Sequence, residues 1–278
     1  MNAKAILPKA STYAVLSVFI VIFLFPIYWM AVSSFRDNSE LMALPPKFSP
    51  IGGSFQNYIK LFHMSEFMTY FKNSVLVASS TVLLTILVAI LAGYALSRFD
   101  FRYKSLLMTA LISIQIFPTT VIIISLFTFY RDLGMLNTYR GLILADTVNA
   151  LPFSIWLIKS FYDTVPRSLD EAAYIDGCGR FRTLWTIITP LILPGLLAIG
   201  VYAFLGSWDD FIFSMTIMKE EAMKTLPIGL AQSFMGEYVY DYSGMMTMSM
   251  VASLPVVILF IFLQKYMVAG LTAGAVKG

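Results

Sequence analysis

The sequence is short of the residues on which disulfide, metal and acid–base chemistry depend. It has 278 residues but a single cysteine, Cys178, and a single histidine, His63. One cysteine cannot form an internal disulfide, and two isolated ligand types far apart in sequence do not indicate a metal site. The phosphate-binding pattern G-x-x-x-x-G-K-[ST] is absent, and no nucleophile–base set is visible. We therefore expect no enzyme activity and no cofactor or metal bound by this chain.

Charge is also scarce. Only 13% of the residues are charged, against about 25% in a typical soluble domain. The net charge of +3 is too small and too scattered to indicate nucleic-acid binding. Hydrophobic residues make up 58% of the chain, which would leave large apolar patches on a soluble protein. Lipid is the solvent that fits this composition.

Long runs without charge predict six transmembrane helices in one all-α, polytopic membrane domain. About 20 apolar residues at 1.5 Å each cross a hydrocarbon core of about 30 Å. The first run is longer than the core of a signal peptide, so we expect it to be retained. The fourth run is interrupted by Asp146 and Pro152. The expected spans are residues 12–34, 73–97, 105–130, 140–160, 192–217 and 243–265.

Lysine and arginine are denser in the loops on one side of these spans. That side carries both termini, the loop "SRFDFRYKS" and the stretch between the fourth and fifth spans. Because basic loops stay in the cytoplasm, we expect these parts to be cytoplasmic.

The most organised polar stretch is "RSLDEAAYIDGCGRFRTLWTIITP", residues 167–190. Ser168 and Glu171 have the S-x-x-E spacing of a capping box, and Asp170 lies where the helix dipole favours an acid. Gly177 can take the left-handed conformation that ends a helix. The pattern predicts a short capped helix, a glycine elbow and a second helix from about Arg180 to Pro190.

The small pair Ala172 and Ala173 would let another surface approach this short helix closely. A docking element is one interpretation, and an amphipathic linker helix lying on the membrane surface is the other. The residues alone leave both open.

The same stretch resembles the EAA motif of ABC-importer permeases. The motif has Glu-Ala-Ala, three residues, Gly, nine residues, Ile, one residue, an apolar position and Pro. The matching positions are Glu171, Ala172, Ala173, Gly177, Ile187, Thr189 and Pro190, with Thr189 in place of the usual Leu.

The resemblance extends over nearly the whole chain. "WDDFIFSMTI" from Trp208 is similar to a fifth-helix segment of the family, with Asp209 replacing the usual Asn. "TLPIGLAQSF" from Thr225 and the tail "GLTAGAVKG" from Gly270 resemble the carbohydrate-uptake branch, in particular the type of the smaller maltose-permease subunit.

The resemblance implies a set of partners in a bacterial or archaeal plasma membrane. A second permease subunit would complete the channel, two cytoplasmic ATPase subunits would bind ATP and Mg²⁺, and an extracytoplasmic binding protein would deliver a sugar or oligosaccharide. The EAA stretch would be the coupling helix seated on an ATPase, and Lys277 in the tail would reach between the ATPases. The implied coupling residues are Ser168, Asp170, Glu171, Ala172, Ala173, Gly177, Ile187 and Pro190.

Polar residues within the spans are candidates for a translocation path, because charge inside a bilayer is costly and usually functional. The candidates are Asp146, Asn149, Trp208, Asp209 and Asp210. Alternatively, the two last acids lie near the outer water and Trp208 is an interfacial anchor or packing group. A self-contained secondary transporter that uses Asp146 or Asp209 as an ion site is the alternative function.

The outer loop between the fifth and sixth spans is the expected contact for the binding protein. By resemblance, the tip of this loop would lie near Phe234, Met235, Gly236 and Glu237. A plain connecting loop is the alternative.

Overall fold

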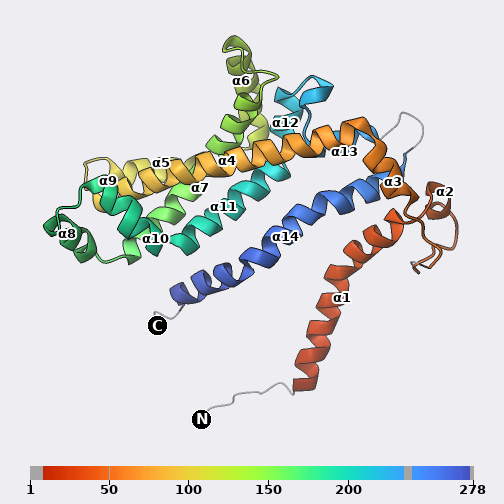
Figure 1. Cartoon of the computed structure of the whole chain (residues 1–278), viewed down its shortest axis with the longest axis horizontal. Coiled ribbons are helices and arrows are strands. Elements are labelled where there is room, and N and C mark those ends of the chain that lie inside the picture. Colours follow the sequence, from red (N-terminus) through yellow and green to blue (C-terminus); the bar gives the residue numbers. More distant parts are fainter. Residues whose placement is uncertain (1–8, 50, 235–239, 276–278) are drawn as a thin grey trace. The chain divides into compact units, whose positions relative to one another are not determined.

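The computed structural model describes residues 9–49, 51–234 and 240–275, and every regular element in these ranges is a helix (Figure 1). The expected all-α architecture is therefore confirmed. The longer helices are α1 (Lys9–Ser34), α4 (Ser65–Arg98), α5 (Lys104–Ile114), α6 (Thr119–Asp132), α7 (Tyr139–Thr164), α11 (Leu193–Trp208) and α14 (Tyr242–Ala275). The shorter ones are α2 (Asn38–Leu41), α3 (Gln56–His63), α8 (Ser168–Ile175), α9 (Arg180–Arg182), η1 (Thr183–Ile188), α10 (Thr189–Leu191), α12 (Ile212–Ile217), η2 (Glu221–Met223) and α13 (Leu226–Ser233).

Within the described residues, four helices are long and apolar enough to cross a membrane, namely α1, α4, α7 and α14. Two further candidates are broken. Helices α5 and α6 are bent by 98° relative to each other, and the helical stretch Arg180–Leu191 is bent by 82° relative to α11. By length and composition, the part of the chain that the structure describes has up to six candidate spans if each bent pair counts as one.

The expected third span, residues 105–130, is not one straight helix. Pro118 precedes α6 with φ −60° and ψ 127°, an extended conformation that interrupts the helix. Proline has no N–H to donate to the preceding turn, so the helical hydrogen bonds cannot run through this point.

The expected fifth span, residues 192–217, is also interrupted. Helix α11 ends at Trp208, and α12 begins at Ile212. The Asp210 carboxylate accepts hydrogen bonds from the backbone N–H groups of Phe213 (3.1 Å) and Ser214 (2.7 Å). These bonds satisfy free N–H donors in the first turn of α12, whose N-cap position is the next residue, Phe211.

The chain divides into two compact units. The first holds residues up to 65 and residues 230–254. In it, the Asn57 side-chain amide donates to the backbone oxygens of Ser34 (3.0 Å) and Arg36 (2.8 Å), and the Thr247 hydroxyl donates to Ser34 O at 3.1 Å. Because the last carbonyls of a helix lack intrahelical partners, these bonds complete the end of α1.

The second unit holds residues 66–229 and the chain from Pro255 onward. Within it, α7 packs against α5 and α11 (Figure 1). Gly93 permits the close approach of α4 to α7, since a Cβ there would lie 2.8 Å from Ile158 Cγ2. The main buried cluster lies beside α8 and contains Ala89, Ile90, Tyr94, Ile155, Ile158, Tyr162, Ile188, Ile192 and Ile199.

Candidate functional site

The motif-bearing stretch begins as a short helix, α8, but not with the expected capping box. The helix starts at Ser168, and the cap position falls to Arg167, which has helical φ and ψ and makes no side-chain capping bond. Instead, the Leu169 N–H in the first turn donates at 3.2 Å to the backbone oxygen of Pro166, which precedes the helix. The capping-box prediction is wrong because the helix begins one residue too early for it.

The glycine elbow is confirmed. Gly177 has φ +78°, and two backbone bonds close the end of α8: Gly177 N–H donates to Tyr174 O (3.1 Å) and Cys178 N–H donates to Ala173 O (2.8 Å). This pair of bonds is the Schellman arrangement, which needs a left-handed residue at its centre. The chain direction after α8 is therefore fixed by hydrogen bonds.

The expected second helix is also present, with an internal change of winding. Helix α9, the π-helix η1 and α10 follow one another from Arg180 to Leu191. Thr189, which stands where the family usually has Leu, is buried. Ile187 is half-buried and Pro190 is exposed.

Helix α8 presents different motif residues to the solvent and to the protein. Ser168, Glu171, Ala172 and Gly177 are exposed, whereas Asp170 and Ala173 are buried. Ala173 therefore packs inside this chain, and only Ala172 of the pair is open to a partner.

Exposed apolar side chains surround this face. Ile175 is 86% exposed and Phe181 is 74% exposed, and Leu169 is also exposed. The outer face of α8 therefore mixes large apolar groups with the exposed Glu171 and Ala172.

A buried ion pair holds α8 to the end of α4. Arg98 Nε lies 3.0 Å from the Asp170 carboxylate, and the Tyr94 hydroxyl donates to the same carboxylate at 2.8 Å. Arg98 also donates to the backbone oxygens of Tyr162 (3.2 Å) and Val165 (3.0 Å). The sequence analysis treated Arg98 only as a topology-setting charge. The sequence signal for its structural role was its place as the last residue of an apolar run that ends in "YALSR".

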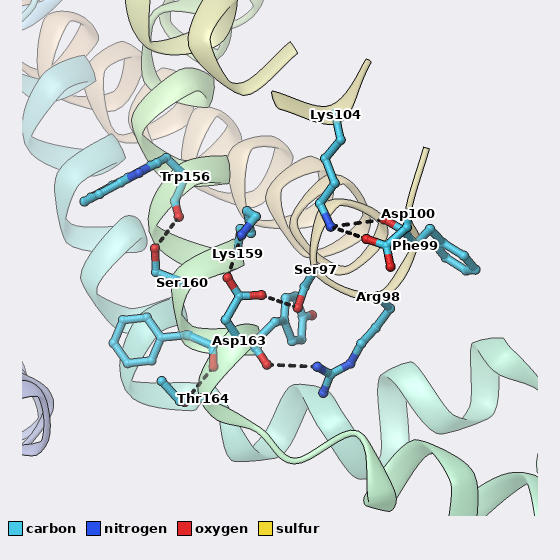
Figure 2. Close-up of polar contacts among 12 residues, drawn as sticks. Ser97, Arg98, Phe99, Asp100, Lys104, Trp156, Lys159, Ser160, Asp163 and Thr164 are labelled. Carbon is cyan, nitrogen blue, oxygen red and sulfur yellow. Dashed lines mark hydrogen bonds and ion pairs between the residues drawn. The ribbon is translucent and has the colours of Figure 1, made fainter. Parts of the chain in front are cut away.

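Figure 2 shows the polar contacts that continue this anchor along α7. The Ser97 hydroxyl donates to the Asp163 carboxylate at 2.7 Å, and Lys159 donates to the other Asp163 oxygen at 2.5 Å (Figure 2). The Arg167 side chain, just before α8, donates at 3.2 Å to the backbone oxygen of Ser97. The ends of α4 and α7 and the start of α8 are thus joined by side chains of three elements.

Three of the five candidate path residues lie together. Asp146, Asn149 and Asp210 line one cavity of about 190 Å³ between α7 and the end of α11. Asp146 accepts a hydrogen bond from the Ser207 hydroxyl at 2.6 Å. Sequence reasoning missed Ser207, whose only signal was its position beside the Trp208–Asp210 motif.

The other two candidate path residues take different places. Trp208 is buried and packs against aromatic rings, with its centroid 5.3 Å from that of Phe204 and 5.8 Å from that of Phe71. Asp209 is exposed and lines neither of the two cavities described here. The packing interpretation of Trp208 agrees with its position.

A second cavity of about 530 Å³ adjoins the first. Asn149, Tyr202 and Phe213 line both cavities. The second one is also lined by Gln115, Thr119 and Tyr130 and by aromatic rings from α6 and the break before it. The bend at Pro118 therefore leaves space among the spanning helices.

The "TLPIGL" stretch is fixed to the first turns of α4. Ser74 Oγ accepts a hydrogen bond from Leu226 N–H at 2.8 Å, and the Asn73 amide donates to Ala222 O (2.9 Å) and Lys224 O (2.8 Å). The nearby Glu221 accepts hydrogen bonds from Lys224 and Tyr70, which lower the pKa of its carboxyl.

The expected binding-protein contacts are only partly within the described residues. Phe234 is buried and packs at Gly244, where an added Cβ would meet its ring. Phe234 is therefore covered within this chain, and its contact with a binding protein stays a prediction. Met235, Gly236, Glu237 and Lys277 lie outside the described residues.

The structure thus combines bent candidate spans, a short helix α8 held by a buried ion pair, and two cavities among the helices. Residues 85–272 match the family of binding-protein-dependent transport system inner membrane components. This chain belongs to that family, as the EAA resemblance indicated, and it is a multi-pass inner-membrane permease subunit of an ABC importer.

Two curated relatives match almost the full chain. The sulfoquinovosyl glycerol transport system permease protein SmoH of Agrobacterium fabrum is 34% identical over 270 residues, which are 97% of this chain and 94% of the relative. The trehalose/maltose transport system permease protein MalG of Thermococcus litoralis is 35% identical over 262 residues, 93% of each chain.

Solved structures share the fold. A chain of a bacterial ABC transporter involved in import of the acidic polysaccharide alginate has a TM-score of 0.84 at 21% identity, covering 96% of this chain and 98% of that chain. A second, from a bacterial alginate ABC transporter in complex with its pentasaccharide-bound periplasmic protein, has a TM-score of 0.66 at 15% identity, covering 92% and 93%. The comparisons support the ABC permease over the self-contained secondary transporter.

Proposed function

We propose that this chain forms half of the translocation channel of a carbohydrate importer and that α8 is its coupling helix. The named cargoes of its relatives, such as trehalose, maltose and diacetylchitobiose, support a sugar or oligosaccharide as cargo. A second permease subunit, two cytoplasmic ATPase subunits and an extracytoplasmic binding protein complete the proposed assembly. ATP and Mg²⁺ bind to the ATPases, and this chain takes no part in the hydrolysis.

The observation that carries the proposal is the two-sided nature of α8. Its outer face exposes Leu169, Glu171, Ala172 and Ile175, which suits docking into a cleft of a partner. Its inner face is held by the buried pair of Asp170 and Arg98. Because α8 is held to the spans on one face and open to a partner on the other, a movement of the partner can displace α8 without detaching it from the spans.

A displacement of α8 is transmitted to the membrane spans by two routes. One is the Arg98–Asp170 pair, which leads into α4. The other is the chain itself, which continues from the elbow at Gly177 through α9, η1 and α10 into α11. Because α7 and α11 line the smaller cavity, a shift of α11 against α7 changes the shape of that cavity.

A charge reversal on the open face of α8 tests the docking role. Glu171→Lys should insert normally but reduce binding-protein-stimulated ATP hydrolysis by about tenfold or more in reconstituted transporter, because a charge at an interface core is replaced by its opposite. Asp132→Lys, at an exposed acid at the end of α6, is the matched control and should leave stimulation unchanged. Full stimulation in Glu171→Lys would remove the docking role of α8.

The orientation is tested with the sole native cysteine removed. In a Cys178→Ala background, Asp176→Cys places a thiol at an exposed position just after α8. We expect a membrane-impermeant maleimide to label this thiol in inside-out vesicles and not in intact cells. Labelling from outside the cell would contradict a cytoplasmic coupling helix and cytoplasmic termini.

A further inference from the structure

The two adjoining cavities share part of their lining. Together they are lined by residues of α5, α6, α7, α11 and α12, with Asn149, Tyr202 and Phe213 common to both. The larger cavity, about 530 Å³, falls within the range of about 300–1,000 Å³ that small-ligand sites occupy. We call this pair of cavities the α7–α11 subsite.

The lining combines hydrogen-bonding groups with aromatic faces. Asp146, Asp210, Asn149 and Gln115 bring carboxylates and side-chain amides, and Thr119 brings a hydroxyl. Rings are supplied by Phe117, Phe129, Tyr130, Tyr202 and Phe213. Hydroxyl-rich sugars match such a lining, because their hydroxyls both donate and accept while their C–H faces pack on rings.

A further property of the lining is the charge of its side chains. Among the residues that the structure describes, no Lys, Arg or His lines either cavity. An anionic group that entered would lose its water and find no cationic partner, and this holds whether or not the two carboxyls carry protons.

We propose that the α7–α11 subsite is a carbohydrate subsite on this subunit that accepts uncharged sugars and rejects anionic ones. The proposal rests on the proposed function and goes further by assigning the charge class of the cargo. Family membership does not decide this point, since a trehalose/maltose system and a transporter of an acidic polysaccharide are both among the similar proteins.

The test is protection of an introduced thiol in the assembled transporter, with Cys178→Ala as background. Val148→Cys replaces a 62% exposed residue that lines the larger cavity. Val121→Cys is the matched control, since Val121 is 60% exposed and lines neither cavity. The probes are maltotriose, which is uncharged, and trigalacturonate, which is anionic.

Maltotriose should slow maleimide labelling of Val148→Cys severalfold and leave Val121→Cys unchanged. At equal concentration trigalacturonate should protect at least about tenfold more weakly, the penalty expected for an uncompensated charge. Adding Asn149→Ala or Tyr202→Ala to Val148→Cys should remove the protection by maltotriose.

Equal protection by both probes would overturn the charge selectivity. No protection by maltotriose, or protection that survives both added substitutions, would overturn the subsite itself. Because thiol protection does not depend on ATP hydrolysis, its failure is distinguishable from a failure of coupling through α8.

Discussion

Arg98 and Asp170 form an ion pair of 3.0 Å in which both side chains are less than a tenth exposed. Arg98 is the last residue of α4, and Asp170 lies in the first turn of α8. The pair therefore joins the end of a membrane span to the helix that carries the EAA motif. Tyr94 donates to the same carboxylate, so the acid has two side-chain partners from α4.

Removing one member of this pair should be costly. Asp170→Ala leaves Arg98 buried without its counter-charge, and breaking a buried ion pair typically costs about 3–5 kcal/mol. Chemical unfolding of the purified protein measures the loss. Asp100→Ala, which removes the exposed partner of Lys104, is the control and should cost about 1 kcal/mol or less. Similar small losses for both variants would show that the Arg98–Asp170 pair does not anchor α8.

The two alanines of the EAA motif should respond differently to a larger side chain. Ala173 is 3% exposed, so Ala173→Leu must displace packed neighbours and should cost about 1–3 kcal/mol. Ala172 is exposed, so Ala172→Leu should leave the free energy of unfolding nearly unchanged. If α8 docks as proposed, Ala172→Leu nevertheless lowers stimulated ATP hydrolysis.

Measuring stability and stimulation on both variants separates packing from docking. A stable Ala172→Leu transporter with full stimulation would argue that the open face of α8 touches no partner. An Ala173→Leu protein as stable as the parent would contradict the buried position of Ala173.

Gly177 should tolerate a side chain less well than Gly179. An L-residue at φ +78° costs about 1–2 kcal/mol, so Gly177→Ala should destabilise by about that amount although its surroundings are open. Gly179 precedes α9 at φ −71°, and nothing lies within 4 Å of an added Cβ. Gly179→Ala should therefore be neutral or slightly stabilising. Equal effects in unfolding experiments would contradict the left-handed elbow.

Sequence patterns predicted the features that depend on local chemistry. The helical class followed from long uncharged runs, and the elbow followed from Gly177. The break at Pro118 has a local cause, a residue that cannot donate a backbone hydrogen bond, but residues 105–130 were predicted as one span and the 98° bend was not predicted. These features depend on the residue itself and its immediate neighbours.

Features that depend on distant partners were missed. Ser168 has capping-box spacing, yet Arg167 takes the cap position of the helix, and the side chains of Arg167 and Asp170 are held by α4. Likewise, Asp210 seemed equivalent to Asp209 in sequence. Only the fold shows that Asp210 accepts hydrogen bonds from the first turn of α12 and shares a cavity with Asp146.

Gly229 is the position in the "TLPIGL" stretch where a side chain should do the most harm. A Cβ at Gly229 would overlap the ring of Tyr70, whose hydroxyl is hydrogen-bonded to Glu221 and therefore cannot swing away freely. Gly229→Ala should cost about 1–3 kcal/mol, as overpacking does. Gly206→Ala is the control within α11. Nothing lies within 4 Å of an added Cβ there, so alanine should stabilise the helix by up to about 1 kcal/mol.

A double-mutant cycle identifies the cause of the loss at Gly229. Tyr70→Leu removes the overlapping ring and its bond to Glu221, so it is destabilising by itself. If the clash is the cause, the double variant Gly229→Ala with Tyr70→Leu should lose less than the sum of the two single losses, by about 0.5–3 kcal/mol. Strict additivity would mean that Gly229 is needed for some reason other than its approach to Tyr70.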